Sequence, residues 1–161
     1  HPTFAGLLNT VRYKNISLSF LIDAKFGAKI YSATNAYAYA RGLHKNTLVG
    51  RETGIGSISA ENIEDYYNKI AFNISEEFIV DSDFAKLREV VLNYQVPKDV
   101  WGRIPFSEVN IGLAGRNLFL LWSKADNIDP EATYTVSNGQ GLEMFGVPST
   151  RTIQLNLNVK F

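Results

Sequence analysis

The sequence has no cysteine, so it can form no disulfide bond, thiolate metal site or catalytic thiol. It also lacks a continuous apolar run of about 18 residues, the length that a membrane-spanning helix requires. Basic and acidic residues number 16 each, and the net charge of zero argues against a nucleic-acid-binding protein, which usually carries a basic excess. These absences leave the residue patterning as the main source of information about fold and function.

The chain opens with HPTFAGLLNT, which has neither a charged start nor a methionine and is therefore not a signal peptide. We expect the chain to be a mature fragment or the later part of a longer protein. Its 161 residues are enough for one domain with a core. Aromatic residues make up 12% of the sequence, which is on the high side.

Apolar and polar residues alternate with a period of two in several long stretches, and this period predicts β-strands. In the stretch 16–31 the even positions are apolar, and the odd positions from Ser17 to Lys29 are polar or glycine except for Leu21. Lys14 and Asn15 separate this stretch from a strand near 4–13, and a two-residue hairpin would place Tyr13 opposite Ile16. In that register Val11 and Leu7 join the apolar face.

Three further strands are expected near 83–97, 107–122 and 151–161. In the first of these, Leu87 falls on the wrong parity, and a β-bulge near Lys86–Arg88 would explain the slip. The closing stretch TIQLNLNVKF alternates without error, and its apolar positions are Ile153, Leu155, Leu157, Val159 and Phe161. The sequence therefore predicts an all-β fold with five antiparallel strands.

Two long segments, near 32–82 and 123–150, connect the strands at one end of the sheet, and tight turns connect them at the other. Ala60–Ile70 in the first segment predicts a short helix, with Ser59 as its N-cap and acidic residues in its first turn. The stretch GRETGIGS is rich in glycine but lacks the Lys-Ser/Thr of a phosphate-binding loop, so we interpret it as a flexible loop. Loops of this length usually carry function.

Two interpretations fit such a sheet. A soluble β-sandwich that binds carbohydrate or protein also alternates apolar and polar positions. A transmembrane β-barrel predicts in addition strands longer than the usual length of about 5–6 residues, loops that are long at one end only, and aromatic residues at the strand ends. The aromatic residues at the strand ends are Tyr13, Tyr31, Trp101, Phe106, Trp122 and Phe161.

In the barrel interpretation the apolar parity faces lipid, and the polar parity faces a wet or plugged lumen. Five strands cannot close a barrel, which needs about eight, and open edges in lipid would leave backbone groups unpaired. The chain would then be one part of a larger barrel.

Several stretches in combination resemble the C-terminal end of SusC/RagA-type TonB-dependent transporters of the Bacteroidetes outer membrane. They include FAKLREVVLNYQVPK, IGLAGRNLFLLW, DNIDPEA and FGVPSTRTIQLNLNVKF, and the resemblance extends over nearly the whole chain. It implies a barrel of roughly 22 strands with an N-terminal plug, of which this chain would form about the last five strands. The plug domain and the TonB box would lie outside the chain.

The resemblance also implies a function, a set of partners and a location. Such transporters import glycans or peptides, with a SusD-like lipoprotein as a lid and with energy from TonB–ExbBD. They lie in the outer membrane, in contact with lipid, with long loops outside the cell and the C-terminus in the periplasm. The final strand, with Ile153, Leu155, Leu157, Val159 and Phe161, would be the signal that the BAM machinery recognises during barrel assembly.

No enzymatic activity is expected, because no Ser, His and acid set stands out, as an outer-membrane protease or lipase would require. Loop residues that could face substrate or lid are Tyr37, Tyr39, Arg41, His44, Trp122 and Tyr134. The alternative role of the rings is packing that holds the loops in shape, and a lone loop histidine is usually a solvated side chain.

Asp126, Asp129 and Glu131 are oxygen ligands close enough in sequence to hold Ca²⁺. Their spacing departs from the EF-hand pattern, and a turn built on Asp or Pro is the alternative. No other cofactor is expected.

Overall fold

The computed structural model describes residues 1–100, 105–132, 135 and 138–161. These residues divide into two compact units. The sheet unit contains His1–Phe26, Phe84–Ser123 and Ser149–Phe161, and the loop unit contains Gly27–Asp83 and Lys124–Pro148.

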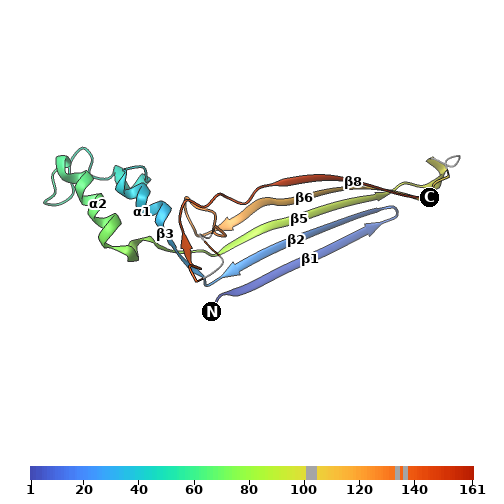
Figure 1. Ribbon diagram of the computed structural model, residues 1–161, viewed down its shortest axis with the longest axis horizontal. Helices are drawn as coiled ribbons and strands as arrows, with labels where there is room; N and C mark the ends of the chain where they lie inside the picture. Colours follow the sequence, from blue (N-terminus) through green and yellow to red (C-terminus); the bar gives the residue numbers. More distant parts are fainter. Residues whose placement is uncertain (101–104, 133–134, 136–137) are drawn as a thin grey trace. The chain divides into compact units, whose positions relative to one another are not determined.

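The sheet unit is a five-stranded antiparallel sheet, whose strands lie side by side in the order β1-β2-β5-β6-β8 (Figure 1). The prediction of an antiparallel all-β sheet is confirmed. The neighbours in this order are also consecutive strands of the unit along the chain. The strands are β1 (Thr3–Tyr13), β2 (Ile16–Phe26), β5 (Phe84–Gln95), β6 (Glu108–Ser123) and β8 (Thr152–Lys160). The 3-10 turn η4 (Lys98–Val100) lies between β5 and β6.

The first hairpin has the predicted register. Tyr13 lies opposite Ile16, and Val11 and Leu7 lie opposite Leu18 and Ile22. Lys14 occupies the turn with a φ of 50°, a left-handed conformation that two-residue hairpins require. The apolar side chains of β1 and β2 therefore lie on the same face of the sheet.

The predicted bulge is also present. Leu21 lies opposite Glu89 and Ile22 lies opposite Leu87, so Arg88 is an extra residue in β5. The extra residue returns Leu87 to the apolar face, which explains its wrong parity in the sequence.

The prediction of a single strand at 16–31 is wrong, because two separate strands cover these residues. β2 ends at Phe26, and Gly27 then has a φ of 72°, which takes the backbone out of the extended conformation. The remaining residues form β3 (Lys29–Ser32), which pairs with β4 (Ile79–Asp81) and β7 (Leu142–Glu143) in a second sheet. Apolar and polar residues alternate on both sides of the break because β3 is also a strand.

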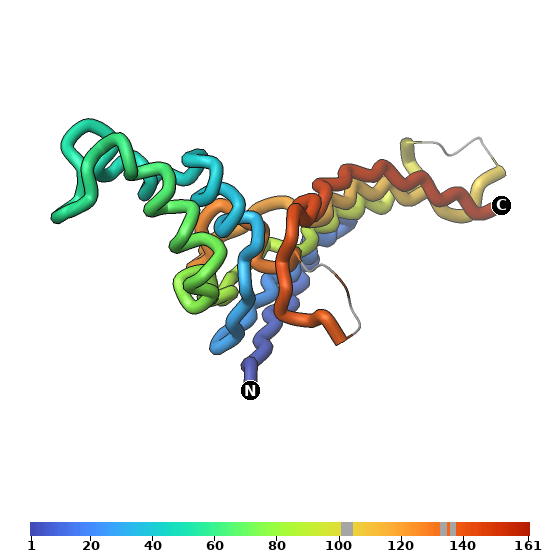
Figure 2. The backbone as a smooth tube through the Cα atoms, turned by 60° about the vertical axis from the view of Figure 1, so that its left-hand side comes forward, coloured from blue at the N-terminus to red at the C-terminus, as the bar shows by residue number. Residues whose placement is uncertain are grey.

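The loop unit contains two α-helices, α1 (Ala33–Ala40) and α2 (Ile63–Asn73), which pack against each other (Figure 2). The predicted helix at Ala60–Ile70 corresponds to α2, but its first turn is the 3-10 turn η2 (Ala60–Asn62), and Asn62 rather than Ser59 is the N-cap of α2. The helix α1 was not predicted, although Ser32 caps it by accepting a hydrogen bond from Asn35 N. Two further 3-10 turns are η1 (Lys45–Leu48) and η3 (Ser75–Phe78).

Most of the buried apolar side chains belong to the loop unit, where Tyr39, Tyr67 and Phe78 form the centre of a core with residues of both helices. The sheet unit has few such residues, namely Ala24, Phe84 and Ala114. The described part of the chain has no helix that is long and apolar enough to cross a membrane.

Candidate functional site

The apolar face of the sheet carries rows of exposed side chains that run across all five strands. One row consists of Val11, Leu18, Leu92, Leu113 and Leu155, each opposite the next. Their exposed fractions run from 40% for Leu18 to 73% for Leu155. A contiguous apolar surface of this kind marks contact with another molecule or a membrane.

The opposite face carries polar and charged side chains. Arg88 forms an ion pair with Asp23 at 2.5 Å and donates to Asn117 Oδ1 at 3.2 Å. Arg116 forms a second ion pair with Glu89 at 2.6 Å. The two faces of the sheet therefore differ in the way that a barrel wall between lipid and a polar lumen requires.

Aromatic rings lie at both ends of the strands. Phe26 and Trp122 are 6.2 Å apart at the end where β2 and β6 finish, and Phe106 and Phe161 are 5.1 Å apart at the other end. Such rings are typical of the interfacial girdles of outer-membrane barrels. Trp101, predicted to belong to this set, lies outside the described residues.

The roots of the two long loops meet at Asp83. Its Oδ1 accepts hydrogen bonds from Gly27 N at 2.6 Å and Ala28 N at 3.3 Å, and its Oδ2 accepts one from Lys124 Nζ at 2.9 Å. The Lys124 ammonium is the largest influence that holds the pKa of Asp83 below its usual range, and Asp83 in turn raises the pKa of Lys124. One carboxylate thus joins three segments of the loop unit.

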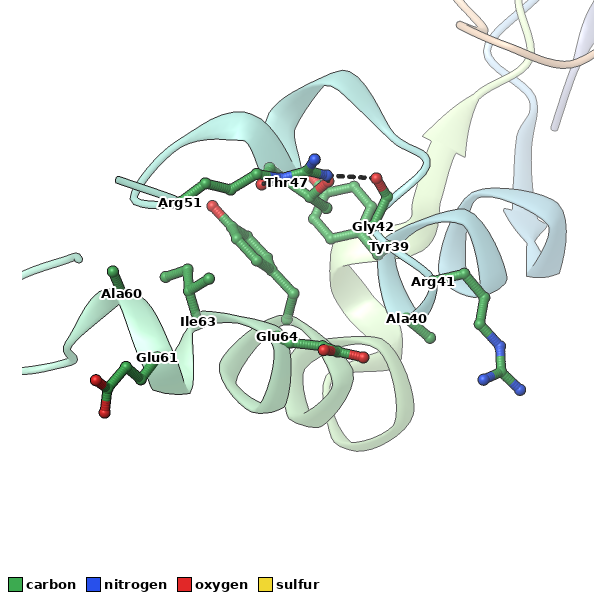
Figure 3. A pocket seen from close by; sticks show the side chains of 11 residues that line it. Tyr39, Ala40, Arg41, Gly42, Thr47, Arg51, Ala60, Glu61, Ile63 and Glu64 are labelled. Atoms are coloured by element: carbon green, nitrogen blue, oxygen red, sulfur yellow. Dashed lines mark hydrogen bonds between the residues drawn. The ribbon is translucent and has the colours of Figure 1, made fainter. Parts of the chain in front are cut away.

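The loop unit contains a cavity of about 460 Å³ between the end of α1 and the start of α2 (Figure 3). Arg51 donates to Thr47 O at 2.8 Å, to Thr47 Oγ1 at 2.9 Å and to the carbonyl of Gly42. The Tyr67 hydroxyl lies 2.9 Å from Val49 O, and burial raises its pKa. Thr47, Arg51 and Tyr67 therefore already make hydrogen bonds within the chain. The remaining lining side chains are Tyr39, Ala40, Arg41, Ala60, Glu61, Ile63 and Glu64.

Among the described residues, those predicted to face substrate or lid do not all line this cavity. Tyr39 and Arg41 line the cavity, although Arg41 extends away from Arg51 (Figure 3). Tyr37 lies in α1, and Trp122 lies at the end of β6 in the sheet unit. Tyr134 lies outside the described residues.

The expectation that His44 is solvated is wrong. His44 is buried, its ring lies 4.6 Å from that of Tyr39, and its Nδ1 accepts a hydrogen bond from Asn46 N at 3.2 Å. Burial lowers the pKa of His44, so the neutral form is favoured. This histidine caps the turn η1 and packs against a core tyrosine.

The carboxylates considered for Ca²⁺ do not come together. Asp126 forms an ion pair with Lys45, which lowers the pKa of Asp126, and Asp129 Oδ1 accepts from Glu131 N at 3.1 Å. No group of three or more His, Asp or Glu side chains among the described residues is placed to hold a metal ion. The bond from Glu131 N is the local contact that the alternative, a turn built on Asp, predicts.

Asp83 and Glu143 connect distant segments of the loop unit, and the sequence did not indicate either role. Glu143 is 1% exposed and accepts hydrogen bonds from Ser32 Oγ at 2.9 Å and Thr34 Oγ1 at 2.5 Å. Its partners are more than a hundred positions away in the chain, so no local pattern could have indicated the contact. The only signal at sequence level was Ser32, a good N-cap residue before an alanine-rich stretch.

Long antiparallel strands with one exposed apolar face, one polar face and aromatic ends are typical of the class of outer-membrane β-barrel walls. Comparison with known proteins specifies this class further. TonB-dependent receptor P3 of Formosa agariphila is 26% identical over 99% of this chain, and TonB-dependent receptor P26 of the same organism is 29% identical over 97%. The chain spans only 16% of the length of each of these relatives. No protein-family model matches the chain.

Among solved structures, the chain is similar to the RagAB peptide importer in its open-open and closed-closed states, with TM-scores of 0.74 and 0.72. The identity is 15% in both cases, and the match covers 98% of this chain and 17% of that one. The resemblance to SusC/RagA-type TonB-dependent transporters is therefore confirmed. These relatives are named as receptors and as a peptide importer, and none of the three names is that of an enzyme, which agrees with the expectation for this chain.

Proposed function

We propose that this chain forms about the last five strands and two extracellular loops of an outer-membrane importer of glycans or peptides. The apolar face of the sheet contacts lipid, and the polar face lines the lumen beside the plug and the remaining barrel. A SusD-like lipoprotein covers the loops, and TonB–ExbBD supplies energy through the part of the protein outside this chain. The C-terminus lies on the periplasmic side.

The observation that carries this proposal is the set of exposed apolar rows in register across five long strands. A soluble β-sandwich would cover such a face with a second layer, so the exposure of Leu113, Ile153 and Leu155 argues against that alternative. The names of the relatives support the same function, since they are TonB-dependent receptors and a peptide importer. The role of the final strand as a BAM signal stays a prediction.

Two neighbouring residues of β8 allow a matched experiment in the full-length transporter. Leu155 lies on the apolar face and Asn156 on the polar face. Leu155→Arg should reduce the amount of folded protein in the outer membrane, because arginine facing lipid costs about 2–4 kcal/mol near the bilayer midplane. Asn156→Arg should have little effect, because its side chain remains in the polar lumen.

The folded fraction is measured in outer-membrane preparations by its altered gel mobility before heating. Equal loss of folded protein in both variants, or a larger loss in Asn156→Arg, would contradict the proposed orientation of the sheet.

A further inference from the structure

Three aromatic rings from separate segments meet on the surface of the loop unit. Tyr37 belongs to α1, Phe72 to α2, and Phe145 to the segment after β7. The Tyr37 ring lies 5.7 Å from that of Phe72 and 5.3 Å from that of Phe145, between ring centroids. These side chains remain 38%, 55% and 59% exposed, so the contact does not bury them.

The backbone of Phe145 is held in an unfavourable conformation. Its φ of 52° lies in the left-handed region, which bulky residues rarely adopt. Phe145 N donates to Thr34 Oγ1 at 2.8 Å, and Thr34 Oγ1 donates to the buried Glu143 at 2.5 Å. Gly146 N also donates to Glu143, at 3.2 Å. Hydrogen bonds anchored on the buried Glu143 therefore fix a strained residue whose ring remains exposed.

Strained residues of this kind are concentrated at ligand-binding sites. All three rings keep exposed surface and contact one another, and a contiguous exposed apolar cluster, unlike apolar side chains that are scattered singly, is typical of a binding surface. We propose that the aromatic cluster of Tyr37, Phe72 and Phe145 is a subsite for an aromatic or branched apolar side chain of a peptide substrate. The inference rests on the proposed function and specifies peptide as the substrate class.

The geometry favours an apolar side chain over a sugar. The ring planes are inclined at 85° for Tyr37 and Phe72 and at 54° for Tyr37 and Phe145, so the rings form no flat platform for a sugar ring. Inclined rings can instead surround another ring in edge-to-face contacts. The polar groups of Ser32, Thr34 and Glu143 are bound to one another and cannot serve sugar hydroxyls.

The experiment uses the full-length transporter, purified in detergent, and two blocked tripeptides, acetyl-Ala-Phe-Ala-amide and acetyl-Ala-Ala-Ala-amide. A linear glucose hexasaccharide is the third probe. The phenylalanine peptide should bind about tenfold more tightly than the alanine peptide, as one well-packed aromatic contact allows. Phe72→Ala and Phe145→Gly should each remove this difference.

Glycine accepts a positive φ, so Phe145→Gly removes the ring and relieves the strain at the same position. Leu43→Ala is the control, because Leu43 is 81% exposed and lies outside the cluster. It should leave the preference unchanged.

Equal binding of the two peptides, or a preference that persists in both cluster variants, would overturn the proposal. Hexasaccharide binding that is lost in the same variants would also overturn it, because the cluster would then serve a carbohydrate. The Leu155→Arg and Asn156→Arg comparison tests membrane insertion separately. A protein that passes that comparison and fails the peptide experiment would retain its proposed function without this subsite.

Discussion

At the scale of single residues, Asp83 links segments that lie far apart in the sequence. Gly27 and Ala28 are 56 and 55 positions away, and Lys124 is 41 positions away. Two backbone N–H groups and one ammonium satisfy the buried carboxylate, so the ionised form is stable in this position. The roots of both loops are thereby held together.

We expect Asp83→Asn to weaken this junction, because the amide loses the ion pair with Lys124 and can no longer accept at both oxygens. Hydrogen exchange of the Gly27 and Ala28 amides should become faster in this variant. Asp65→Asn is the control, since Asp65 and Lys69 form an exposed pair within α2. Unchanged exchange at Gly27 in Asp83→Asn would show that the carboxylate does not hold the junction.

The pH dependence of this junction follows from the two pKa shifts. The pKa of Asp83 is lowered in the folded state, so its contribution is present above the unfolded value of about 3.9 and is lost as pH falls through the folded value. The pKa of Lys124 is raised, so its contribution is present below about 10.4 and is lost as pH rises through the folded value. Protection of Gly27, corrected for intrinsic exchange, should therefore stay constant from about pH 5 to pH 9.

At the scale of secondary-structure elements, the alternation of apolar and polar residues sets the strands, and glycines with positive φ allow tight turns. The segment GRETGIGS, for which the sequence predicts a flexible loop, contains a tight turn in the structure. Ile55 and Ile58 exchange two backbone hydrogen bonds of 2.9 Å across it. Gly54 and Gly56 both have positive φ, at 75° and 58°.

These two glycines differ in the space around them. A Cβ at Gly54 would lie 2.1 Å from Ile58 O, whereas a Cβ at Gly56 would meet no atom within 4 Å. Gly56→Ala should therefore cost only the conformational penalty of about 1–2 kcal/mol. Gly54→Ala should cost more, because the backbone itself must move.

The comparison is made by hydrogen exchange at Ile55 and Ile58 in the full-length protein. We expect a larger loss of protection in Gly54→Ala than in Gly56→Ala. The reverse order would contradict the backbone clash as the deciding factor.

At the scale of the whole molecule, the order of the strands sets where the loops emerge. Both long connections, from β2 to β5 and from β6 to β8, leave the sheet at the same end, because neighbouring strands are antiparallel. If the sheet spans the outer membrane as we propose, the two loops lie on one side of it and the tight turns on the other.

The absence of cysteine in this chain allows this orientation to be tested by labelling. In a cysteine-free full-length protein, Leu48→Cys in the loop unit should react with a membrane-impermeant maleimide in intact cells. Lys98→Cys, in the 3-10 turn η4 between β5 and β6, should react only after the outer membrane is permeabilised. Labelling of position 98 alone in intact cells would reverse the proposed topology.

By itself, the sequence determined the strands, their faces, the first hairpin register and the bulge at Arg88, because a period of two and its interruption are local properties of the chain. Only the tertiary structure decided the break at Gly27, the helix α1, the burial of His44 and the positions of Asp83 and Glu143. The physical reason is distance along the chain, since Glu143 meets Ser32 across 111 positions and Asp83 meets Gly27 across 56. Contacts of this kind depend on the folded loops as a unit and leave no periodic trace in the sequence.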